Sequence, residues 1–328
     1  MRGMSRILLS LLAVLALSLT AMACGDDEGG DTGSSGGEQP SAESSGKLIE
    51  ADPANEGKQF TVGSKNFAEQ YILGEIYAQA LEAAGFTVEK QLDLGSEQIA
   101  FRALKRGNID AYPEYVGTAL TSFYRVKTAD VPRDAEDAYD ELVSSLEADN
   151  LFAGPITPFE NTYRVASTKE TAEKYGTPST LSDLVAEAGD SVRLSGFPEC
   201  RQRTDCYLGL QASYDWSPKF VSSDGQYADL DAGEADFTMA FTTDGPLSTN
   251  KYVLYEDDQD LFPPYNVSLM HNEKANSALG EEGVALLEKI QEPLTQDVMQ
   301  QLNAAVAVDK QQPEEVAANY LKEAGFVE

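Results

Sequence analysis

Asn108–Thr118, with the sequence NIDAYPEYVGT, predicts a short buried strand between a helix and a loop. The preceding Gly107 stands where a glycine typically ends a helix, here one expected over Gln98–Arg106. Ile109–Tyr112 has the length of a buried strand, and Pro113 is expected to end its pairing because proline has no N–H to donate. The residues after Pro113 are therefore expected to form a loop at the carboxyl end of a strand.

The residue types in this predicted loop indicate a binding site. Tyrosine, glutamate and threonine side chains crowd it and offer both ring faces and polar groups. Open α/β sheets place their ligands outside the carboxyl ends of their strands. An ordinary surface turn would contain similar residue types, so the segment alone leaves both interpretations open.

Strands and helices alternate in the sequence before this segment. Gln59–Gly63 and Phe86–Leu92 are strand-like, and the helix between them is expected to start at a cap on Ser64 or Asn66 and to end at Gly85. Alternating β and α elements predict an α/β fold with a mostly parallel sheet covered by helices.

Ser64–Asn66 lies where the first predicted strand ends and the first predicted helix begins. The backbone amides there, together with the Lys65 ammonium, are suited to holding an anion such as a carboxylate. A plain solvated helix cap is the alternative.

The chain also contains a short internal repeat. Leu104–Asp110 (LKRGNID) reappears 126 residues later as Leu230–Asp236 (LDAGEAD), and the same offset places Tyr115 on Phe241. A match this short can arise by chance, so it is a weak signal of a repeat. A true repeat would predict two similar lobes, each with an aromatic ring beyond an equivalent strand, and a cleft between them.

The second half of the chain continues the alternation. Strands are expected at Asn161–Ala166, Ser191–Ser195 and Asp236–Ala240. Two amphipathic helices, Gly283–Leu302 and Pro313–Gly325, are expected to pack back on the first lobe.

Residues 1–23 have the parts of a secretory signal peptide. Arg2 and Arg6 precede a mostly apolar run, Ile7–Leu19, and small residues follow it. The run is shorter than the ~20 residues that a transmembrane helix needs.

Cys24 directly follows Ala23 in a segment that resembles a bacterial lipobox, in which the cysteine becomes the lipid-modified N-terminus. Ala21 stands where leucine is more common in that motif, and ordinary signal-peptide cleavage is the alternative. Residues 24–57 are rich in Gly, Ser, Asp and Glu and predict a flexible linker, because they have too little apolar surface to offset the entropy of ordering. Such a linker would tether a folded part to a membrane surface.

The charge and length of the chain restrict its class. It has 55 acidic and 24 basic side chains, which argues against a nucleic-acid partner because phosphate binding requires clustered Lys and Arg. An acidic surface mainly keeps an exported protein soluble. The 271 residues after position 57 exceed one average domain and suit two α/β lobes.

Cys200 and Cys206 remain as an even pair once Cys24 is assigned to the leader. In an exported chain such a pair predicts a disulfide, which would contribute about 2 kcal/mol by constraining the unfolded chain. Two free thiols are an alternative. A metal site is disfavoured because His271 is the only histidine and no Cys-x-x-Cys spacing occurs.

Several segments together resemble a known family, the substrate-binding proteins of ABC importers for quaternary ammonium osmolytes. Two of them are Gly63–Gln70 (GSKNFAEQ) and Tyr112–Thr118 (YPEYVGT). Three more follow in the expected order: Thr242–Gly245 (TTDG), Glu256–Asp258 (EDD) and Phe262–Tyr265 (FPPY). The resemblance extends from about Gln59 to the C-terminus. It implies a type II periplasmic-binding fold, with two lobes, two crossing strands and a ligand held in the closed cleft.

The resemblance also implies lobe boundaries and site residues. The first lobe would comprise residues 58–160 and 266–328, and the second lobe residues 161–265. The aromatic cage of the family would consist of four rings here: Tyr115, Tyr163, Phe241 and Tyr265. Its anion-binding groups would be the following three: Lys65, Thr118 and Arg203.

Two departures from the family pattern affect this assignment. Phe241 replaces a tyrosine, which keeps the ring face and loses a hydroxyl. Cys200 and Cys206 stand where the family normally has Phe and Gly, so Arg201 competes with Arg203 as the arginine of the site.

A cage combined with an anion clamp suits a betaine. A trimethylammonium group cannot donate a conventional hydrogen bond, whereas ring faces attract it by about 0.5–2 kcal/mol each when desolvated. A betaine carboxylate instead requires Arg, Lys and hydroxyl donors. The chain has 15 Tyr and 13 Phe, so most of its rings are expected to serve packing rather than binding.

Proteins of other classes fit the sequence less well. An amino-acid-binding protein of the same fold would need a carboxylate for a primary ammonium, and Asp110, Glu114 or Asp244 would serve. A secreted hydrolase would need a nucleophile with a base, but the chain has the single histidine His271 and no Gly-x-Ser-x-Gly motif. A receptor's sensing domain would be joined to a cytoplasmic output segment, which we do not expect here.

We therefore expect a solute-binding component of an ABC importer, not an enzyme, that works with permease subunits in the membrane. It is expected to lie outside the cytoplasm, anchored through lipid on Cys24 to the outer face of a bacterial cell membrane. No cofactor, metal or nucleic acid is expected. The sequence does not choose among glycine betaine, proline betaine, choline and carnitine, because that choice depends on the volume of the cleft.

Overall fold

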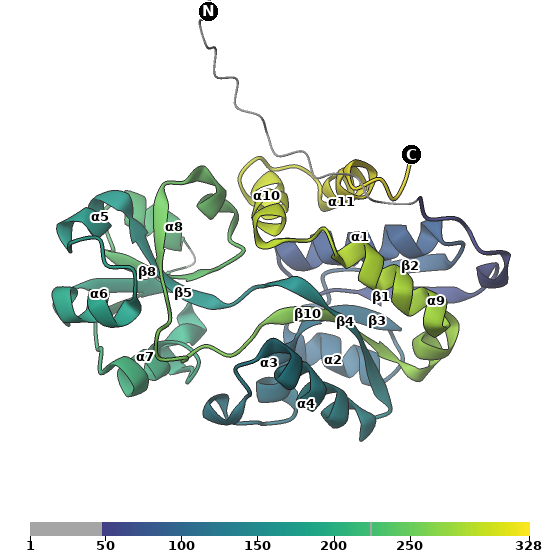
Figure 1. Cartoon of the computed structure of the whole chain (residues 1–328), viewed down its shortest axis with the longest axis horizontal. Helices are drawn as coiled ribbons and strands as arrows, with labels where there is room; N and C mark the ends of the chain where they lie inside the picture. Colours follow the sequence, from purple (N-terminus) through teal and green to yellow (C-terminus); the bar gives the residue numbers. More distant parts are fainter. Residues whose placement is uncertain (1–47, 224) are drawn as a thin grey trace, which may run out of the picture. The chain divides into compact units, whose positions relative to one another are not determined.

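The computed structural model describes residues 48–223 and 225–328 (Figure 1). The predicted signal peptide, Cys24 and residues 25–47 of the predicted linker lie outside the described residues. Residues 48–57, also predicted as linker, instead pack on the folded part: Ile49 N donates to Phe326 O over 2.9 Å and Asp52 N to Ala84 O over 3.0 Å. Composition missed these contacts because backbone groups make them, whatever the side chain.

The first of two sheets has five strands in the order β2-β1-β3-β10-β4. Its strands are β1 (Gln59–Gly63), β2 (Thr87–Gln91), β3 (Ala111–Tyr115), β4 (Leu151–Glu160) and β10 (Asn266–Asn272). β1 is parallel to β2 and β3, whereas β10 is antiparallel to β3 and β4. We call this sheet and its helices the first lobe.

The second sheet repeats this plan in the order β7-β6-β8-β5-β9. Its strands are β5 (Tyr163–Thr168), β6 (Arg193–Gly196), β7 (Lys219–Ser222), β8 (Phe237–Phe241) and β9 (Tyr252–Tyr255). β6 is parallel to β7 and β8, and β5 is antiparallel to β8 and β9. With its helices it forms the second lobe, so the predicted two-lobed α/β architecture is confirmed. Each sheet has as many antiparallel as parallel pairings, so the expectation of a mostly parallel sheet was wrong.

Helices cover both sheets (Figure 1). In the first lobe, α1 and α9 pack on one face of the sheet, and α2 and α4 pack on the other. The first-lobe helices are α1 (Ala68–Ala83), α2 (Glu97–Lys105), α3 (Val116–Thr118), α4 (Ala135–Glu147) and α9 (Glu273–Gln291). The second-lobe helices are α5 (Lys169–Lys174), α6 (Leu181–Ala188), α7 (Tyr207–Tyr214) and α8 (Gln226–Asp231). The chain ends in α10 (Gln296–Ala307) and α11 (Pro313–Glu323).

The short internal repeat corresponds to equivalent structure in the two lobes. Gly107 and Gly233 end α2 and α8 with left-handed φ angles of 69° and 67°. Asp110 Oδ2 accepts a hydrogen bond from Thr61 N on the neighbouring strand over 2.9 Å. Asp236 Oδ2 accepts one from the backbone N of Arg193 over 2.9 Å. The repeat therefore marks the same helix-to-strand turn in both lobes.

The prediction that Pro113 ends strand pairing was wrong. Pro113 lies in the middle of β3, opposite Leu269 of the antiparallel strand β10. β1 pairs with β3 only at Ala111, so beyond that residue one edge of β3 has no strand beside it, and a missing N–H there costs no ladder hydrogen bond. The predicted loop is also a helix, since α3 starts at Val116 directly after the strand.

The start of α1 also differs from the prediction. α1 begins at Ala68 with Phe67 as an N-cap that provides no side-chain hydrogen bond, whereas Ser64 or Asn66 was expected. Ser64 Oγ is used instead by the backbone, because it accepts from Asp93 N over 3.2 Å.

The predicted helix Gly283–Leu302 is two helices. α9 ends at Gln291 and α10 starts at Gln296, because Pro293 between them cannot continue a helical hydrogen-bond pattern. α11 packs on α1 as expected, but α10 contacts both α1 and the segment Gly245–Thr249 of the second lobe. The expectation that the C-terminal helices pack back on the first lobe is therefore confirmed, and α10 contacts the second lobe in addition.

Two crossing segments connect the lobes, one between β4 and β5 and the other between β9 and β10 (Figure 1). They lie side by side, since Asn161 N donates to Tyr265 O over 3.1 Å and Thr162 Oγ1 donates to Pro263 O over 3.3 Å. This arrangement confirms the two crossing strands that the resemblance implies.

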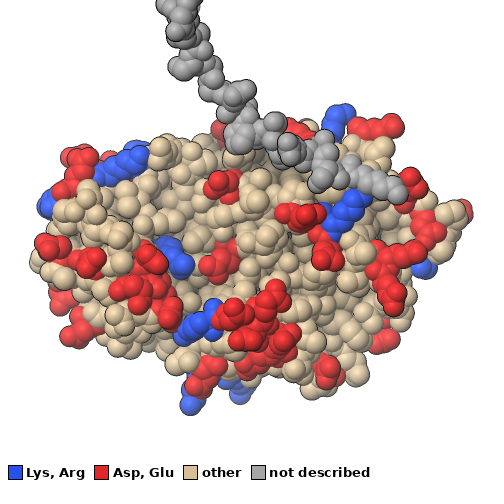
Figure 2. Space-filling view, in the orientation of Figure 1, with Lys and Arg blue, Asp and Glu red and all other residues tan. Residues whose placement is uncertain are grey.

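Asp and Glu side chains are scattered over the face of the molecule in Figure 2, with fewer Lys and Arg between them. This agrees with the formal net charge of −31. Within residues 48–223 and 225–328, no helix combines the length and apolar character that a membrane span requires. The same residues contain no group of His, Cys, Asp and Glu side chains arranged to hold a metal ion.

Candidate binding cleft

A cavity of about 720 Å³ is lined by residues from both lobes and from α10. The seven residues predicted to bind ligand all line it: Lys65, Tyr115, Thr118, Tyr163, Arg203, Phe241 and Tyr265. Arg201, the competing arginine, is exposed and does not line this cavity. The seven residues come from the ends of β1, β3 and β8, the start of β5, the loop after β6, the end of α3 and the segment just before β10. Residues far apart in the sequence therefore meet here.

A wall of aromatic rings closes the second-lobe side of the cavity. The Tyr163 ring lies 4.7 Å from that of Phe241 and 5.8 Å from that of Tyr265, between ring centroids. Phe197 adds a fourth ring, 6.0 Å from Tyr163 and 5.9 Å from Phe241. Tyr163 and Phe241 are neighbours because they pair directly at the start of β5 and the end of β8.

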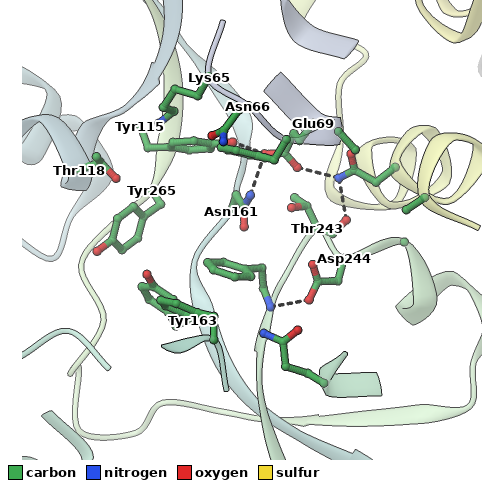
Figure 3. A pocket seen from close by; sticks show the side chains of 18 of the residues that line it. Lys65, Asn66, Glu69, Tyr115, Thr118, Asn161, Tyr163, Thr243, Asp244 and Tyr265 are labelled. Atoms are coloured by element: carbon green, nitrogen blue, oxygen red, sulfur yellow. Dashed lines mark hydrogen bonds between the residues drawn. The ribbon is translucent and has the colours of Figure 1, made fainter. Parts of the chain in front are cut away.

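Tyr115 forms the opposite wall. Figure 3 shows it across the cavity from Tyr163 and Tyr265. Its ring stacks on that of Phe67 with 6.2 Å between centroids, and its hydroxyl donates to Glu69 Oε1 over 2.7 Å. Burial and the Glu69 charge raise the pKa of Tyr115 well above its ordinary value, so the phenol stays neutral. The two walls leave a gap with ring faces on both sides.

Lys65 lies at the cavity, but its charge is already balanced. Its ammonium forms a salt bridge with Glu114, and both side chains are buried. Glu114 also accepts from Tyr112 Oη over 3.0 Å and from Tyr115 N over 2.8 Å. The Lys65 amide, which we expected to face an anion, donates instead to Gln70 Oε1 over 3.1 Å.

Arg203 forms an ion pair through two of its three guanidinium nitrogens. Its Nε and Nη2 donate to the two oxygens of Asp205 over 2.7 and 2.5 Å, and no described residue pairs with Nη1. Tyr265 Oη donates to the same carboxylate over 2.8 Å. Burial would raise the pKa of Asp205, but the hydrogen bonds from Arg203 outweigh burial and lower it. Arg203 is therefore held in one orientation at the ring wall, 5.8 Å from the Tyr163 centroid.

The loop that carries Arg203 and Asp205 is closed by a disulfide. Cys200 and Cys206 are bonded, with 5.2 Å between their Cα atoms, which confirms the predicted bridge. Both cysteines are buried. The bridge confines the short segment on which both partners of the ion pair lie.

A buried carboxylate, Glu69, joins three parts of the molecule. It accepts from Tyr115 Oη of the first lobe, from Asn161 Nδ2 of a crossing segment over 2.8 Å and from Asn303 Nδ2 of α10 over 2.7 Å. Asn303 Nδ2 also donates to Thr243 O over 2.8 Å. Glu69, Asn161 and Asn303 all line the cavity.

Asp244 lies at the same end of the cavity as Thr243 (Figure 3). Its Oδ2 accepts from Phe241 N and from Tyr227 Oη, both over 2.8 Å. Burial raises the pKa of Asp244 to about 6, and the Glu69 charge adds to the shift, although both hydrogen bonds oppose it. Asp110 and Glu114, the other two carboxylates considered for a primary ammonium, are engaged within the first lobe by Lys274 and Lys65.

Several lining residues escaped the sequence reasoning. Phe197 follows a predicted strand, as Tyr115 does. Its place at the carboxyl end of a strand therefore could have identified it as a binding residue. Glu69, Asn161 and Asn303 gave no local signal, because their roles depend on contacts between residues as far as 234 positions apart. Phe67 also lines the cavity, and 39% of its surface is exposed.

Residues 58–323 match the protein family described as the substrate-binding domain of ABC-type glycine betaine transport systems. A glycine-betaine-binding protein of Pseudomonas aeruginosa is 32% identical over 279 residues, which cover 80% of this chain and 86% of that protein. The glycine betaine-binding protein YehZ of Escherichia coli is 28% identical over 295 residues, covering 84% of this chain and 93% of YehZ.

Another relative is larger than this chain. The ergothioneine transport permease/ergothioneine binding protein of Helicobacter pylori is 29% identical over 278 residues, which cover 83% of this chain. The chain spans only about half of that relative, 49% of its length.

Solved structures show the same fold. The structure of a glycine betaine/carnitine/choline ABC transporter aligns with a TM-score of 0.72 and 23% identity, covering 80% of this chain and 98% of that one. Ligand-free YehZ of E. coli aligns with a TM-score of 0.67 and 26% identity, covering 81% of this chain and 99% of YehZ. The family match extends over most of the chain and includes both lobes. The chain therefore belongs to the family of substrate-binding domains of ABC-type glycine betaine transport systems, which bind solutes for transport and are not enzymes.

Proposed function

We propose that this protein captures a quaternary ammonium solute, such as glycine betaine, proline betaine, choline or carnitine, in an aromatic cage. The observation that carries the proposal is the wall of Tyr163, Phe197, Phe241 and Tyr265 facing Tyr115 across one cavity. Ring faces attract a diffuse positive charge, and they do so more strongly when water is excluded. Phe241 provides such a face without the hydroxyl of the tyrosine that the family resemblance implies at this position.

The anion side of the proposed site is centred on Arg203. Its unused Nη1 edge is available to a ligand carboxylate, and a guanidinium suits a carboxylate in geometry as well as charge. Thr118 is the proposed hydroxyl donor, and Figure 3 shows it beside Tyr265. Lys65 completes the set, with a smaller contribution because its side chain is only 6% accessible, against 33% for Arg203.

We propose the following cellular arrangement. Residues 1–23 direct export, Cys24 is acylated, and the protein is held at the outer face of the bacterial cell membrane, where it delivers ligand to ABC permease subunits. The lobes are bounded at residues 58–160 with 266–328 and at 161–265, in keeping with the strands of each sheet. Mass spectrometry of the N-terminus tests the anchor: an unmodified N-terminus on the membrane-associated protein would contradict it.

The cage is tested by calorimetry with choline and with 3,3-dimethylbutan-1-ol (dimethylbutanol below). In the second compound a carbon atom replaces the quaternary nitrogen of choline. The two molecules have nearly the same shape, so burial alone predicts similar affinity. Several desolvated ring contacts predict a loss of about 2 kcal/mol or more, above about tenfold in Kd. Glycine betaine, carnitine and ergothioneine complete the ligand panel.

Two variants make this test specific to the cavity. Phe241→Leu keeps apolar bulk but removes a ring face, so it is expected to weaken choline more than dimethylbutanol. Phe123→Leu is the matched control, because Phe123 stacks on Phe101 away from the cavity. Equal binding of choline and dimethylbutanol to the wild-type protein would reject the cage.

A further inference from the structure

Three consecutive residues, Arg203, Thr204 and Asp205, connect the disulfide-closed loop to its surroundings, and we call them the loop tip. Arg203 lines the cavity, and its guanidinium carbon lies 5.8 Å from the centroid of the Tyr163 ring. Thr204 reaches the first lobe, where its hydroxyl oxygen is 3.1 Å from that of Thr128. The same short segment therefore carries a proposed ligand contact and a contact between the lobes.

Asp205 lies behind the cavity wall. It is only 4% exposed and does not line the cavity, yet its carboxylate accepts two hydrogen bonds from Arg203 and one from Tyr265. Asp205 and Arg203 are two positions apart in the chain, so their pairing keeps its geometry only while the backbone of the loop tip keeps its shape. Whatever fixes this backbone therefore also fixes the direction of the Arg203 guanidinium.

The Cys200–Cys206 bridge limits the shapes that the loop tip can take. One cysteine precedes the tip and the other follows it, with 5.2 Å between their Cα atoms. Both are fully buried in the hydrophobic core, so the two ends of the loop are fixed to the core and to each other. Two backbone hydrogen bonds support the same shape, from Arg203 N to Cys200 O over 3.1 Å and from Cys206 N to Arg203 O over 3.3 Å. Each of these can open by itself, whereas the covalent closure remains.

The rings of the cavity are held in other ways. Tyr163 and Phe241 are positioned by the direct pairing of β5 with β8. Tyr265 is held through its backbone, since its O accepts from Asn161 N over 3.1 Å, and its ring packs closely on Gly117, where a Cβ would lie 3.1 Å from it. Opening the bridge is therefore expected to disturb Arg203 more than the ring wall.

Resting on the proposed function, we propose that the Cys200–Cys206 bridge sets ligand selectivity. It holds Arg203 in the orientation that binds a carboxylate, which lowers the entropy that this side chain and its loop lose when ligand binds. Cys200, Cys206 and Asp205 are then positioning residues that act through Arg203, since none of the three lines the cavity. The consequence is a higher affinity for betaines, which carry a carboxylate, relative to choline, which has none.

Calorimetry of the double variant Cys200→Ala/Cys206→Ala tests this role. The ligands are choline and a betaine, either glycine betaine or carnitine, whichever binds the wild-type protein more tightly. The ratio of the betaine Kd to the choline Kd is expected to rise at least fivefold in the variant. Leu142→Ala is the control for a loss of stability alone, because Leu142 is buried in the first lobe and does not line the cavity. A smaller rise in the double variant, or an equal rise in Leu142→Ala, overturns the inference.

A double-mutant cycle with Arg203→Ala decides whether the bridge acts through this arginine. If it does, Arg203→Ala weakens betaine binding at least fivefold less in the protein without the bridge than in the protein with it. Equal losses in the two backgrounds would overturn the inference. The cycle also decides the matter by itself if the wild-type protein binds a betaine and not choline.

Reversible reduction provides the same test without a substitution. A dithiol such as dithiothreitol gives two electrons and two protons to the bridge, which yields two cysteine thiols and the cyclic disulfide of the reductant. Because both cysteines are buried, the ligand-free protein is reduced in mild denaturant, which is then removed, and mass spectrometry confirms two additional thiols. The Kd ratio is expected to rise at least fivefold on reduction and to return on reoxidation with oxidised glutathione.

A ratio that reduction leaves unchanged, or that reoxidation does not restore, overturns the inference, and this experiment decides it if the double variant does not fold. In the first case the proposed function would still stand, because the wild-type protein would bind its ligands as before. Wild-type protein that binds neither choline nor any betaine would contradict the proposed function, and the inference would fail with it. Binding of choline alone would overturn the inference, because Arg203 would then hold no carboxylate.

Discussion

At the residue scale, fixed partners orient the charged side chains of the cleft. Asp205 accepts two hydrogen bonds from Arg203 and a third from Tyr265, so one carboxylate orients both the arginine and one ring of the wall. Lys65 is neutralised by Glu114, a residue from the same lobe. Each cation is therefore paired with one carboxylate, and they differ in exposure, since 33% of the Arg203 side chain is accessible and only 6% of the Lys65 side chain.

This inequality predicts how Arg203→Ala changes affinity. A betaine is expected to lose about 1.5–3 kcal/mol, the value of a charge-assisted hydrogen bond, whereas choline has no carboxylate and should lose little. Calorimetry with both ligands measures the difference. Arg201→Ala is the matched control, because Arg201 belongs to the same disulfide-closed loop but is exposed and outside the cavity. Equal losses for betaine and choline would show that Arg203 supports the loop rather than the anion.

Asp244 predicts a pH dependence of stability in the ligand-free protein. Burial raises its pKa from 3.8 to about 6. Between these values the folded state binds more protons than the unfolded state, so the free energy of unfolding is expected to fall as pH rises from about 4 to about 6. Because the side chain is partly exposed, we expect a contribution on the order of 1–2 kcal/mol.

Denaturant titrations of the wild-type protein and Asp244→Asn at pH 4, 5 and 6 isolate this contribution. The amide does not titrate in this range, so the difference in stability between the two proteins should change in favour of Asp244→Asn as pH rises. A difference that stays constant across the range would contradict the assigned environment of Asp244.

At the element scale, α10 connects the two lobes. It follows the first-lobe helix α9, yet Gln300 Nε2 donates to Thr242 O over 2.7 Å and Asn303 Nδ2 to Thr243 O over 2.8 Å in the second lobe. Gly245 permits this contact, since a Cβ there would lie 2.7 Å from both the backbone N and Cα of Ala304. The turn after β8 is thus in direct backbone contact with α10.

Gly245→Ala is expected to be destabilising, because helix backbone cannot yield as a flexible side chain would. We expect a loss of about 1–3 kcal/mol, the range for overpacking. Gly225→Ala is the control, since a Cβ at Gly225 would meet its nearest neighbours at 3.7 and 3.8 Å, which are ordinary contacts. Denaturant unfolding of both variants measures the contrast. Equal stability of the two would show that α10 does not hold this position in solution.

At the scale of the whole molecule, the binding site belongs to neither lobe alone. Tyr115 comes from the first lobe, and the facing ring wall comes from the second lobe and a crossing segment. The lobes also meet at Thr128 and Thr204, whose hydroxyl oxygens are 3.1 Å apart. A ligand that contacts both walls therefore binds best when the lobes are close together.

Ligand is expected to shift an equilibrium between open and closed forms toward the closed form, because only closure brings both sets of contacts to one ligand. Small-angle scattering should detect a smaller radius of gyration at saturating ligand. A non-binding solute at the same concentration serves as the control. An unchanged radius with a ligand that calorimetry shows to be bound would contradict closure.

Local signals in the sequence determined much of the architecture. Gly107 and Gly233, each followed by an aspartate three positions later, marked the same turn in both lobes because left-handed φ angles favour glycine. The positions of Tyr115 and Phe241 at strand ends placed a ring of each lobe in the cleft before any tertiary contact was known. The Cys200–Cys206 pair followed from the spacing and expected compartment of the cysteines.

Tertiary structure decided what those side chains contact. Pro113 lies within a strand because the edge beyond Ala111 has no neighbour, which no local pattern reveals. The family resemblance implied Lys65 and either Arg203 or Arg201 at the cleft, but only packing decided for Arg203 and gave Lys65 the partner Glu114 and Arg203 the partner Asp205. Glu69 meets Asn303 across 234 residues because α10 returns to the cleft. Signals of periodicity, capping and turns act over a few residues, whereas the partners of buried polar groups are set by the packing of the entire chain.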